Sequence, residues 1–211
     1  MSYMRSPARQ RQILDCAKRV FATRGFHAAS IADICEAAGI GRGTLYQYFR
    51  NKKSVFTAIL RETLDRVRAL MERQTVAGQR FPAPERLTRT QAIEFSAAQL
   101  REVLAVVFDD EDTLRIVLRE AVGLDVDIET LLAEIDDVFI GIVERGLIAV
   151  RDAGITRDLD ARMVATIIVG GVEKLALAAL RSDAPVDLDA LAREAAHLHA
   201  VGVLSDRVRP E

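Results

Sequence analysis

The chain has 211 residues, half of them apolar and 28% charged, which is the composition of a globular protein long enough to bury a core. No apolar run approaches the roughly 20 residues that a membrane-spanning helix needs, and the polar N-terminus lacks the apolar core of a signal peptide. We therefore expect a cytoplasmic protein without a membrane segment.

Charge is distributed unevenly along the chain. Residues 1–60 hold ten Lys or Arg and three Asp or Glu, whereas the rest of the chain holds nineteen basic and twenty-eight acidic residues. A basic first part on an acidic remainder is expected where only the first part meets a polyanion. A solvated surface is the alternative for any basic stretch, so the interpretation depends on the motif that this part contains.

The cysteines and histidines do not suggest a metal site. Cys16 and Cys35 fall on the apolar faces of expected helices, so we interpret them as buried small side chains rather than redox or metal-binding groups. The three histidines, His27, His197 and His199, do not form a ligand set with them. We expect no metal and no cofactor.

The first expected helix runs from Arg5 to about Arg24, and Gly25 ends it. Its apolar residues recur at helical spacing and form one face. These residues are Ile13, Leu14, Ala17, Val20 and Phe21.

Residues 30–49 predict two short helices joined by a tight turn. Ser30 and Asp33 form a Ser-x-x-acid pattern that caps the first of them. Gly39 follows, where a helix end commonly needs a left-handed residue. The first helix therefore ends at a turn short enough for a second helix to pack against it.

The second helix of this pair is expected from Arg42 to about Phe49, with Gly41 before it. Leu45 and Phe49 are four residues apart and face inward, whereas the polar residues project elsewhere. A helix-turn-helix of this kind places its second helix in the major groove of DNA.

The same stretch resembles the N-terminal signature of the tetracycline-repressor (TetR/AcrR) family. The matching residues follow in order: Ile31-Ala32, Ala37-Ala38-Gly39-Ile40, Gly43-Thr44-Leu45-Tyr46, Tyr48-Phe49 and Lys52. The resemblance covers about a quarter of the chain. It implies a DNA-binding domain over residues 1–52 and a ligand-binding and dimerisation domain over residues 53–211. Many members have Ser or Thr where this chain has Gly41, so one potential phosphate contact is missing.

The resemblance implies that Thr44, Tyr46, Tyr48 and Lys52 mostly contact phosphates, which orient the protein without reading sequence. Replacing Lys52 should then weaken binding to all DNA and lower its salt dependence. Arg42 and Gln47 can donate bidentate hydrogen bonds to guanine and adenine, so we expect them to read base edges. The expected DNA-binding set is Arg42, Gly43, Thr44, Tyr46, Gln47, Tyr48 and Lys52.

A long helix is expected from a cap at Asn51 to about Ala77, and the stretch from Gly78 to Pro84 then breaks the chain. Beyond it the apolar spacing predicts helices over about 87–108, 112–122, 128–153, 160–181 and 188–203, with no strand pattern. The sequence therefore predicts an all-α fold of about nine helices, a three-helix head and a helical-bundle body.

The helix expected over residues 160–181 differs from the others because its residues 163–172 are apolar nearly all round. Such a helix must be covered on every side, either by its own domain as a deeply buried core helix or by a second chain. The resemblance implies a homodimer, whose two heads would read half-sites about 34–36 Å apart. The expected interface residues are Val164, Ile167, Ile168, Gly171, Leu175, Leu188, Leu191, Ala195 and Leu198.

The resemblance also implies a small-molecule pocket between the middle helices of the body. The expected ligand-binding residues are Gln91, Phe95, Gln99, Phe108, Arg119, Phe139 and Glu173. For polar candidates such as these, and for Arg115, Asp137 and Glu144, a solvated face or an internal ion pair is the alternative. Because the chain has no Trp and its three Tyr all lie before residue 50, an aromatic cage is absent and an aliphatic or acyl-type effector is favoured.

These features predict a ligand-responsive transcriptional repressor that binds a palindromic operator as a homodimer and is released by a small apolar or amphipathic effector. An architectural or activating DNA-binding protein without an effector is the alternative. An enzyme is not expected, because the sequence has no paired metal-ligand motif, no glycine-rich phosphate loop after a strand and no nucleophile elbow.

Overall fold

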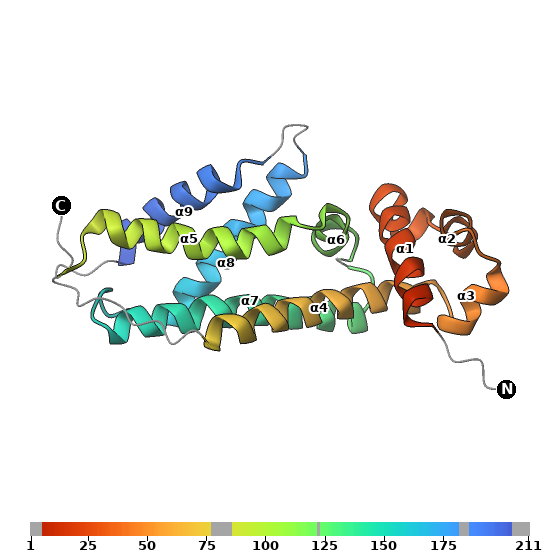
Figure 1. Cartoon of the computed structure of the whole chain (residues 1–211), viewed down its shortest axis with the longest axis horizontal. Coiled ribbons are helices and arrows are strands. Elements are labelled where there is room, and N and C mark those ends of the chain that lie inside the picture. The colour runs from red at the N-terminus through yellow and green to blue at the C-terminus, as the bar shows by residue number, and fades with distance from the viewer. Residues whose placement is uncertain (1–5, 77–85, 122, 182–185, 204–211) are drawn as a thin grey trace. The chain divides into compact units, whose positions relative to one another are not determined.

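The computed structural model describes residues 6–76, 86–121, 123–181 and 186–203. The regular elements in these ranges are helices (Figure 1). In chain order they are α1 (Pro7–Ala28), α2 (Ile31–Ala38), α3 (Arg42–Tyr48), α4 (Lys52–Val76), α5 (Arg89–Phe108), α6 (Glu111–Arg115), η2 (Ile116–Glu120), α7 (Val126–Asp152), α8 (Ala161–Ala179) and α9 (Leu188–Val203). The prediction of an all-α fold of about nine helices is confirmed over these ranges. The break expected at residues 78–84 lies outside them.

One expected helix has a different local form. The helix predicted over residues 112–122 begins as α6 and continues as the π-helical segment η2. A π-helical turn inserts one extra residue into the helical repeat and is common at functional positions.

The described residues belong to two compact units. The first is Met1–Arg68 with Asp110–Ile135, and the second is Ala69–Asp109 with Asp136–Glu211. These boundaries fall within α4, between α5 and α6, and within α7, and none lies at residue 52. The division into functional domains at residues 1–52 and 53–211 therefore stays a prediction.

The core of the first unit explains why a later segment joins the head. Side chains from the first four helices are completely buried there, including Phe21, Ile34 and Leu45. Three residues from far along the chain belong to the same buried cluster, namely Ile116, Ala121 and Ile128. The head core is therefore completed by η2 and the start of α7, which no local pattern in the first 60 residues indicates.

The second unit packs its helices through small side chains. Helix α5 lies beside α9, where Ala97, Ala196 and Ala200 are buried together with Ile93. Arg101 on α5 also forms an ion pair with Asp189 on α9 at 2.9 Å. Alanines at this contact allow the two helix backbones to approach closely, which holds them as a pair.

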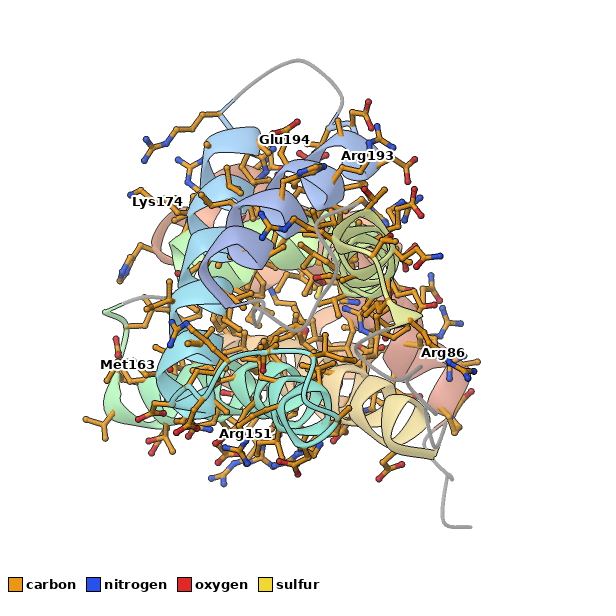
Figure 2. All side chains as sticks on the ribbon, turned by 90° about the vertical axis from the view of Figure 1, so that its left-hand side faces the viewer. Arg86, Arg151, Met163, Lys174, Arg193 and Glu194 are labelled. Atoms are coloured by element: carbon orange, nitrogen blue, oxygen red, sulfur yellow. The ribbon has the colours of Figure 1, made fainter. Side chains whose placement is uncertain are left out.

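Helix α8 covers α7 with one face and leaves another face open. Ala165 and Ile168 are buried against residues such as Ile140 and Leu147 of α7. Figure 2 shows Met163 and Lys174 along the outer edge of α8, and Met163 is one of several large apolar residues exposed in this unit. The second chain that the sequence suggested for this face would therefore meet an apolar surface.

The cysteines lie where the apolar pattern placed them. Cys16 and Cys35 are both buried and unpaired. Burial raises the pKa of the Cys35 thiol, while the positive charge of Arg42 opposes that shift. The described part of the chain contains no group of three potential metal ligands. None of its helices combines the length and apolar character that crossing a membrane requires.

Candidate nucleic-acid interface

Helix α2 is fixed at both ends by the residues that the sequence singled out. The Ser30 hydroxyl accepts a hydrogen bond from the Asp33 N–H at 3.2 Å, and the Asp33 carboxylate accepts one from the Ser30 N–H at 2.8 Å. The Ser30 hydroxyl also donates a hydrogen bond to the Asp33 carboxylate at 2.7 Å, and this bond, together with the one from the Ser30 N–H, lowers the pKa of Asp33. At the other end Gly39 adopts a left-handed conformation with φ 63°. The predicted capping box and glycine turn are both confirmed.

Helix α3 buries one face and presents the other. Leu45 is completely buried and Phe49 nearly so, as predicted. Arg42, Gly43, Tyr46 and Gln47 are exposed, with 52% of the Tyr46 surface accessible. A Cβ atom added at Gly43 would meet nothing within 4 Å, so the backbone faces open space there. This face of α3 is free to enter a groove.

Thr44 and Tyr48 are half-buried on the same helix. The Tyr48 hydroxyl oxygen accepts a hydrogen bond from the Ser6 N–H at 3.2 Å, which connects the end of α3 to the start of α1. A phenolic hydroxyl both accepts and donates. Its proton is therefore still able to bond to a phosphate oxygen, and the expected phosphate contact stays a prediction.

Lys52 lies differently from the expectation. Its ammonium group donates hydrogen bonds to the carbonyl oxygens of Phe26, His27 and Ala29, at 2.5, 3.2 and 2.7 Å. An ammonium group has three N–H donors. In this arrangement all three are used inside the protein, so the geometry does not favour the phosphate contact expected from the sequence.

Other basic side chains of the head are also paired. Lys53 forms ion pairs with Asp125 at 3.1 Å and Asp127 at 2.8 Å, and Arg24 forms one with Asp33 at 2.9 Å. The segment 110–135, which supplies several of the acidic partners, contains eight acidic and two basic residues. The local positive potential is therefore smaller than the count over residues 1–60 suggests.

Several exposed arginines of the head take part in none of the ion pairs found in the described ranges. Two of them, Arg42 and Arg50, lie at the start of α3 and just after its end. Their charges remain available to a polyanion.

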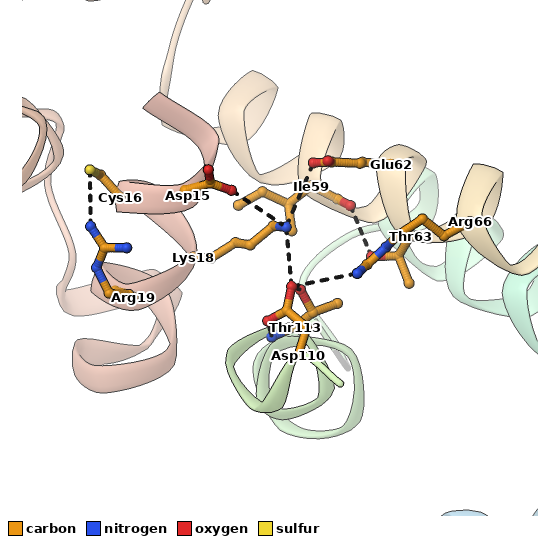
Figure 3. A network of polar contacts seen from close by, with 10 residues as sticks. All are labelled: Asp15, Cys16, Lys18, Arg19, Ile59, Glu62, Thr63, Arg66, Asp110 and Thr113. Carbon is orange, nitrogen blue, oxygen red and sulfur yellow. Dashed lines mark hydrogen bonds and ion pairs between the residues drawn. The ribbon is translucent and has the colours of Figure 1, made fainter. Parts of the chain in front are cut away.

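Lys18 is the buried cation of the head, with 7% of its surface accessible (Figure 3). Its ammonium nitrogen lies 3.2 Å from Asp110 and 3.7 Å from Glu62. Asp110 also accepts hydrogen bonds from the backbone N–H and hydroxyl of Thr113, so it caps α6. Arg66 of α4 approaches the same carboxylate at 3.5 Å. One carboxylate thus joins α1, α4 and α6.

Burial would raise the pKa of the Asp110 carboxyl, but the hydrogen bonds from Thr113 and the charge of Lys18 outweigh it. The pKa therefore lies below its ordinary value. The sequence did not predict this network, because Lys18 and Asp110 are 92 residues apart and each resembles an ordinary surface charge.

The expected ligand-binding residues are distributed over both units. Arg119 is exposed in the first unit, whereas the other six lie in the second. Gln91 is exposed, and its side chain accepts a hydrogen bond from the Thr88 N–H at 3.0 Å as part of the cap of α5. Three of the set are half-buried, namely Gln99, Phe108 and Phe139. Phe95 and Glu173 are exposed. A ligand role for this set stays a prediction.

Three further polar candidates form the internal ion pairs that were the alternative. Arg115 pairs with Glu111 within α6. Asp137 and Glu144 both pair with Arg162, at 2.5 and 3.2 Å, which links α7 to α8. These contacts account for the three side chains without a ligand.

Most of the expected interface residues are accessible in the single chain. Ile167 exposes 64% of its surface and Leu198 exposes 75%. Leu175 and Gly171 are also exposed, whereas Ile168 is buried. Four others are half-buried: Val164, Leu188, Leu191 and Ala195. A shallow apolar groove lies between Ile167 and Leu198 and has Gly171 and His199 along it.

Comparison with known proteins identifies the head. The family model described as "Bacterial regulatory proteins, tetR family" matches residues 13–59, which run from α1 into α4 and include all of the helix-turn-helix. The head of this chain therefore matches the tetR family of bacterial regulatory proteins. Its members are DNA-binding transcriptional regulators rather than enzymes, in agreement with the sequence prediction.

Relatives of this chain match well beyond the head. It is 26% identical over 193 residues to the "Fatty acid metabolism regulator protein" of Bacillus subtilis, covering 91% of this chain and 94% of the relative. It is 29% identical over 162 residues to the "HTH-type transcriptional repressor KstR2" of Mycolicibacterium smegmatis, covering 74% and 72%.

A solved structure shows the same fold. The transcriptional regulator FadR from Bacillus subtilis, in complex with stearoyl-CoA, matches with a TM-score of 0.70 at 23% identity. The match covers 91% of this chain and 98% of FadR. The chain therefore shares the fold of this regulator over nearly all of its length.

Proposed function

We propose that this chain is a ligand-responsive transcriptional repressor, acting in the cytoplasm, that binds a palindromic operator as a homodimer. The observation that carries the proposal is the outward face of α3. Arg42 and Gln47 are exposed there, while Leu45 on the opposite face anchors the helix in the core. Arg and Gln are the side chains that read guanine and adenine in the major groove.

The exposed apolar surface of α8 and α9 supports the homodimer. Large apolar side chains that stay accessible on one face commonly mark a protein interface. Ile167 and Gly171 are one helical turn apart, and the glycine lets a partner helix approach closely. Two chains related by a two-fold axis would present the two heads to two half-sites.

The proposed effector is an acyl thioester of coenzyme A, which is amphipathic. The relative named as a fatty acid metabolism regulator aligns over 94% of its own length, and the FadR structure of the same fold holds stearoyl-CoA. The shortage of aromatic residues in the body also favours an aliphatic ligand over a cationic one. Binding to the body would release the operator through a coupling free energy of about 1–3 kcal/mol.

A mobility-shift experiment tests the proposal. Labelled DNA that flanks the protein's own coding region is titrated with the protein, next to random DNA of the same length. The expected result is binding at least about a thousand-fold tighter than to random DNA. Release is then measured with stearoyl-CoA, free stearate and free coenzyme A.

The release series separates the possible outcomes. Stearoyl-CoA should free the DNA at lower concentration than either of its parts. Tight specific binding that no acyl thioester relieves would contradict the effector class. Equal binding to random DNA would instead contradict the operator and favour an architectural protein.

A further inference from the structure

We propose that Lys52 and Glu120 are positioning residues, which fix the orientation of the helix-turn-helix by holding the corner between α1 and α2. This corner comprises residues 25–29. The inference rests on the proposed DNA-binding function and assigns Lys52 a different role from the phosphate contact expected from the sequence.

The corner needs hydrogen-bond partners because a helix ends there. Gly25 leaves the helical region with φ 78° and ψ 159°, and α1 ends at Ala28. The last carbonyl groups of a helix have no partner within the helix. They also form the negative end of the helix dipole, which attracts a cation.

Lys52 satisfies this end of α1. Its ammonium group bonds to the carbonyls of Phe26, His27 and Ala29, and it lies 4.5 Å from the centre of the Phe26 ring. The Phe26 ring in turn lies 4.8 Å from the ring of Phe56, within the head core. A lysine held by three carbonyls and an aromatic ring is fixed in position rather than free to follow a phosphate.

The bond between Lys52 and Ala29 closes the helix-turn-helix. Ala29 directly precedes the Ser30 cap of α2, and Lys52 is the first residue of α4, just after α3. The two helices that contact DNA therefore lie inside a loop of chain whose ends are joined by a 2.7 Å hydrogen bond. A displacement of Lys52 would move the start of α2 relative to the end of α3.

Glu120 holds the same corner from the other side. Its carboxylate accepts a hydrogen bond from the Phe26 N–H at 3.2 Å. A Cβ atom at Gly25 would lie 2.8 Å from this carboxylate oxygen, so the glycine leaves the room that Glu120 occupies. Phe26 is thus bound by its N–H to Glu120 and by its carbonyl to Lys52.

This arrangement predicts an effect on sequence reading. Bidentate bonds from Arg42 or Gln47 to a base edge need a defined geometry, whereas phosphate contacts occur on any sequence. Loosening the corner should therefore weaken operator binding more than binding to random DNA. It should leave the number of neutralised phosphates unchanged, because Lys52 has no donor left for one.

The test compares Lys52→Met with the exposed control Arg50→Met. Fluorescence anisotropy gives the affinity for the operator fragment and for random DNA over a range of salt concentrations, and circular dichroism confirms folding at the temperature used. For Lys52→Met we expect the ratio of operator to random affinity to fall about tenfold, near the value of one bidentate base contact. The slope of log affinity against log salt concentration should not change. Arg50→Met should lower that slope by up to about 0.9 and keep the ratio.

A second pair of variants tests the other side of the corner and does not depend on Lys52. Glu120→Gln keeps an oxygen that can accept the Phe26 N–H, whereas Glu120→Leu does not. We expect Glu120→Gln to retain the wild-type ratio of operator affinity to random-DNA affinity. In Glu120→Leu this ratio should fall about tenfold, and the salt slope should not change in either variant.

The outcomes distinguish this inference from the proposed function. A lower salt slope with equal losses on both DNAs for Lys52→Met would make Lys52 a phosphate contact and overturn the inference. Unchanged affinities in folded Lys52→Met and Glu120→Leu would overturn it as well, by reducing the corner to a stabilising feature. A wild-type protein that does not distinguish the operator from random DNA would instead contradict the function itself.

Discussion

Gly25 combines φ 78° with ψ 159°, a region of backbone conformation that is essentially limited to glycine. This conformation turns the chain out of α1 and directs the Phe26 N–H toward Glu120. A single glycine thus sets both the end of a helix and the place of Glu120, which lies 94 residues after Phe26 in the sequence.

Gly25→Ala should lower the free energy of unfolding by about 1–3 kcal/mol, because alanine is strained at this φ and ψ and its methyl group displaces Glu120. Urea unfolding followed by circular dichroism measures the change. The control is Gly146→Ala, in the interior of α7, where a Cβ meets nothing within 4 Å. That substitution should stabilise the protein by up to about 1 kcal/mol. Equal changes in the free energy of unfolding at both positions would contradict the conclusion that the backbone at Gly25 requires glycine.

Arg42 differs from the other cations of the head because it lies on the outward face of α3. Arg42→Ala should weaken binding to the operator by about 1–3 kcal/mol, with a much smaller loss on random DNA. Titration of both DNAs with the wild type and the variant measures the difference. A loss of the same size on random DNA would show that Arg42 contacts a phosphate rather than a base.

At the scale of elements, the first turn of α6 is attached to the head through Asp110. The carboxylate caps α6 by its bonds to Thr113 and pairs with Lys18, which is buried on α1. A buried cation that loses its nearest carboxylate keeps its desolvation cost. The pair therefore holds two elements together only while Asp110 is ionised.

Asp110→Asn should lower the free energy of unfolding at pH 7 by about 1.5–3 kcal/mol, the range for a hydrogen bond to a charged group. The pKa of Asp110 is depressed in the folded state, so its stabilising contribution is present above the ordinary value near 4 and is lost as pH falls through the folded pKa. The difference between variant and wild type should thus shrink below about pH 4. Asp109→Asn, at an exposed neighbouring position, should change stability by less than about 0.5 kcal/mol at either pH. A difference that stays constant with pH would contradict the role of the charge.

The elements of the helix-turn-helix could be predicted because their signals are local. Ser30 and Asp33 are three residues apart, and Leu45 and Phe49 are four apart, so helical geometry alone places each pair. Glu120 could not be predicted as part of the corner. Its partner is distant in sequence, and a glutamate on an amphipathic helix usually faces water.

The role of Lys52 illustrates the same limit. Its position in the family signature predicted that Lys52 lies near DNA. The signature does not indicate that the carbonyl oxygens of the α1–α2 corner accept the hydrogen bonds of its ammonium group. The π-helical form of η2 was also not predicted, since the periodicity of residues 116–120 does not distinguish one extra residue in a turn.

At the scale of the whole molecule, the expected assembly depends on an apolar face that the single chain leaves accessible. Ile167 and Leu198 lie on α8 and α9 with most of their surface exposed. Burying such side chains contributes about 1.5–3 kcal/mol each. Their burial against a second copy would therefore contribute favourably to association.

Ile167→Glu should shift the protein toward a monomer, because a carboxylate would be desolvated in the interface. Size-exclusion chromatography with light scattering measures the mass, and the operator titration should show a parallel loss of affinity. Ala149→Glu places the same charge on an exposed position of α7 and should leave both unchanged. A variant Ile167→Glu that remains dimeric would place the interface elsewhere.

The cluster that joins Ile116, Ala121 and Ile128 to the head has a practical consequence for hybrid regulators. An exchange of residues 1–60 between two relatives would transfer the surface expected to contact DNA. It would not transfer Ile116, Ala121 and Ile128, which form part of the core packed against that segment. Hybrids that also carry the donor's residues 110–135 should keep the packing of the head core intact. Their operator preference should then be that of the donor.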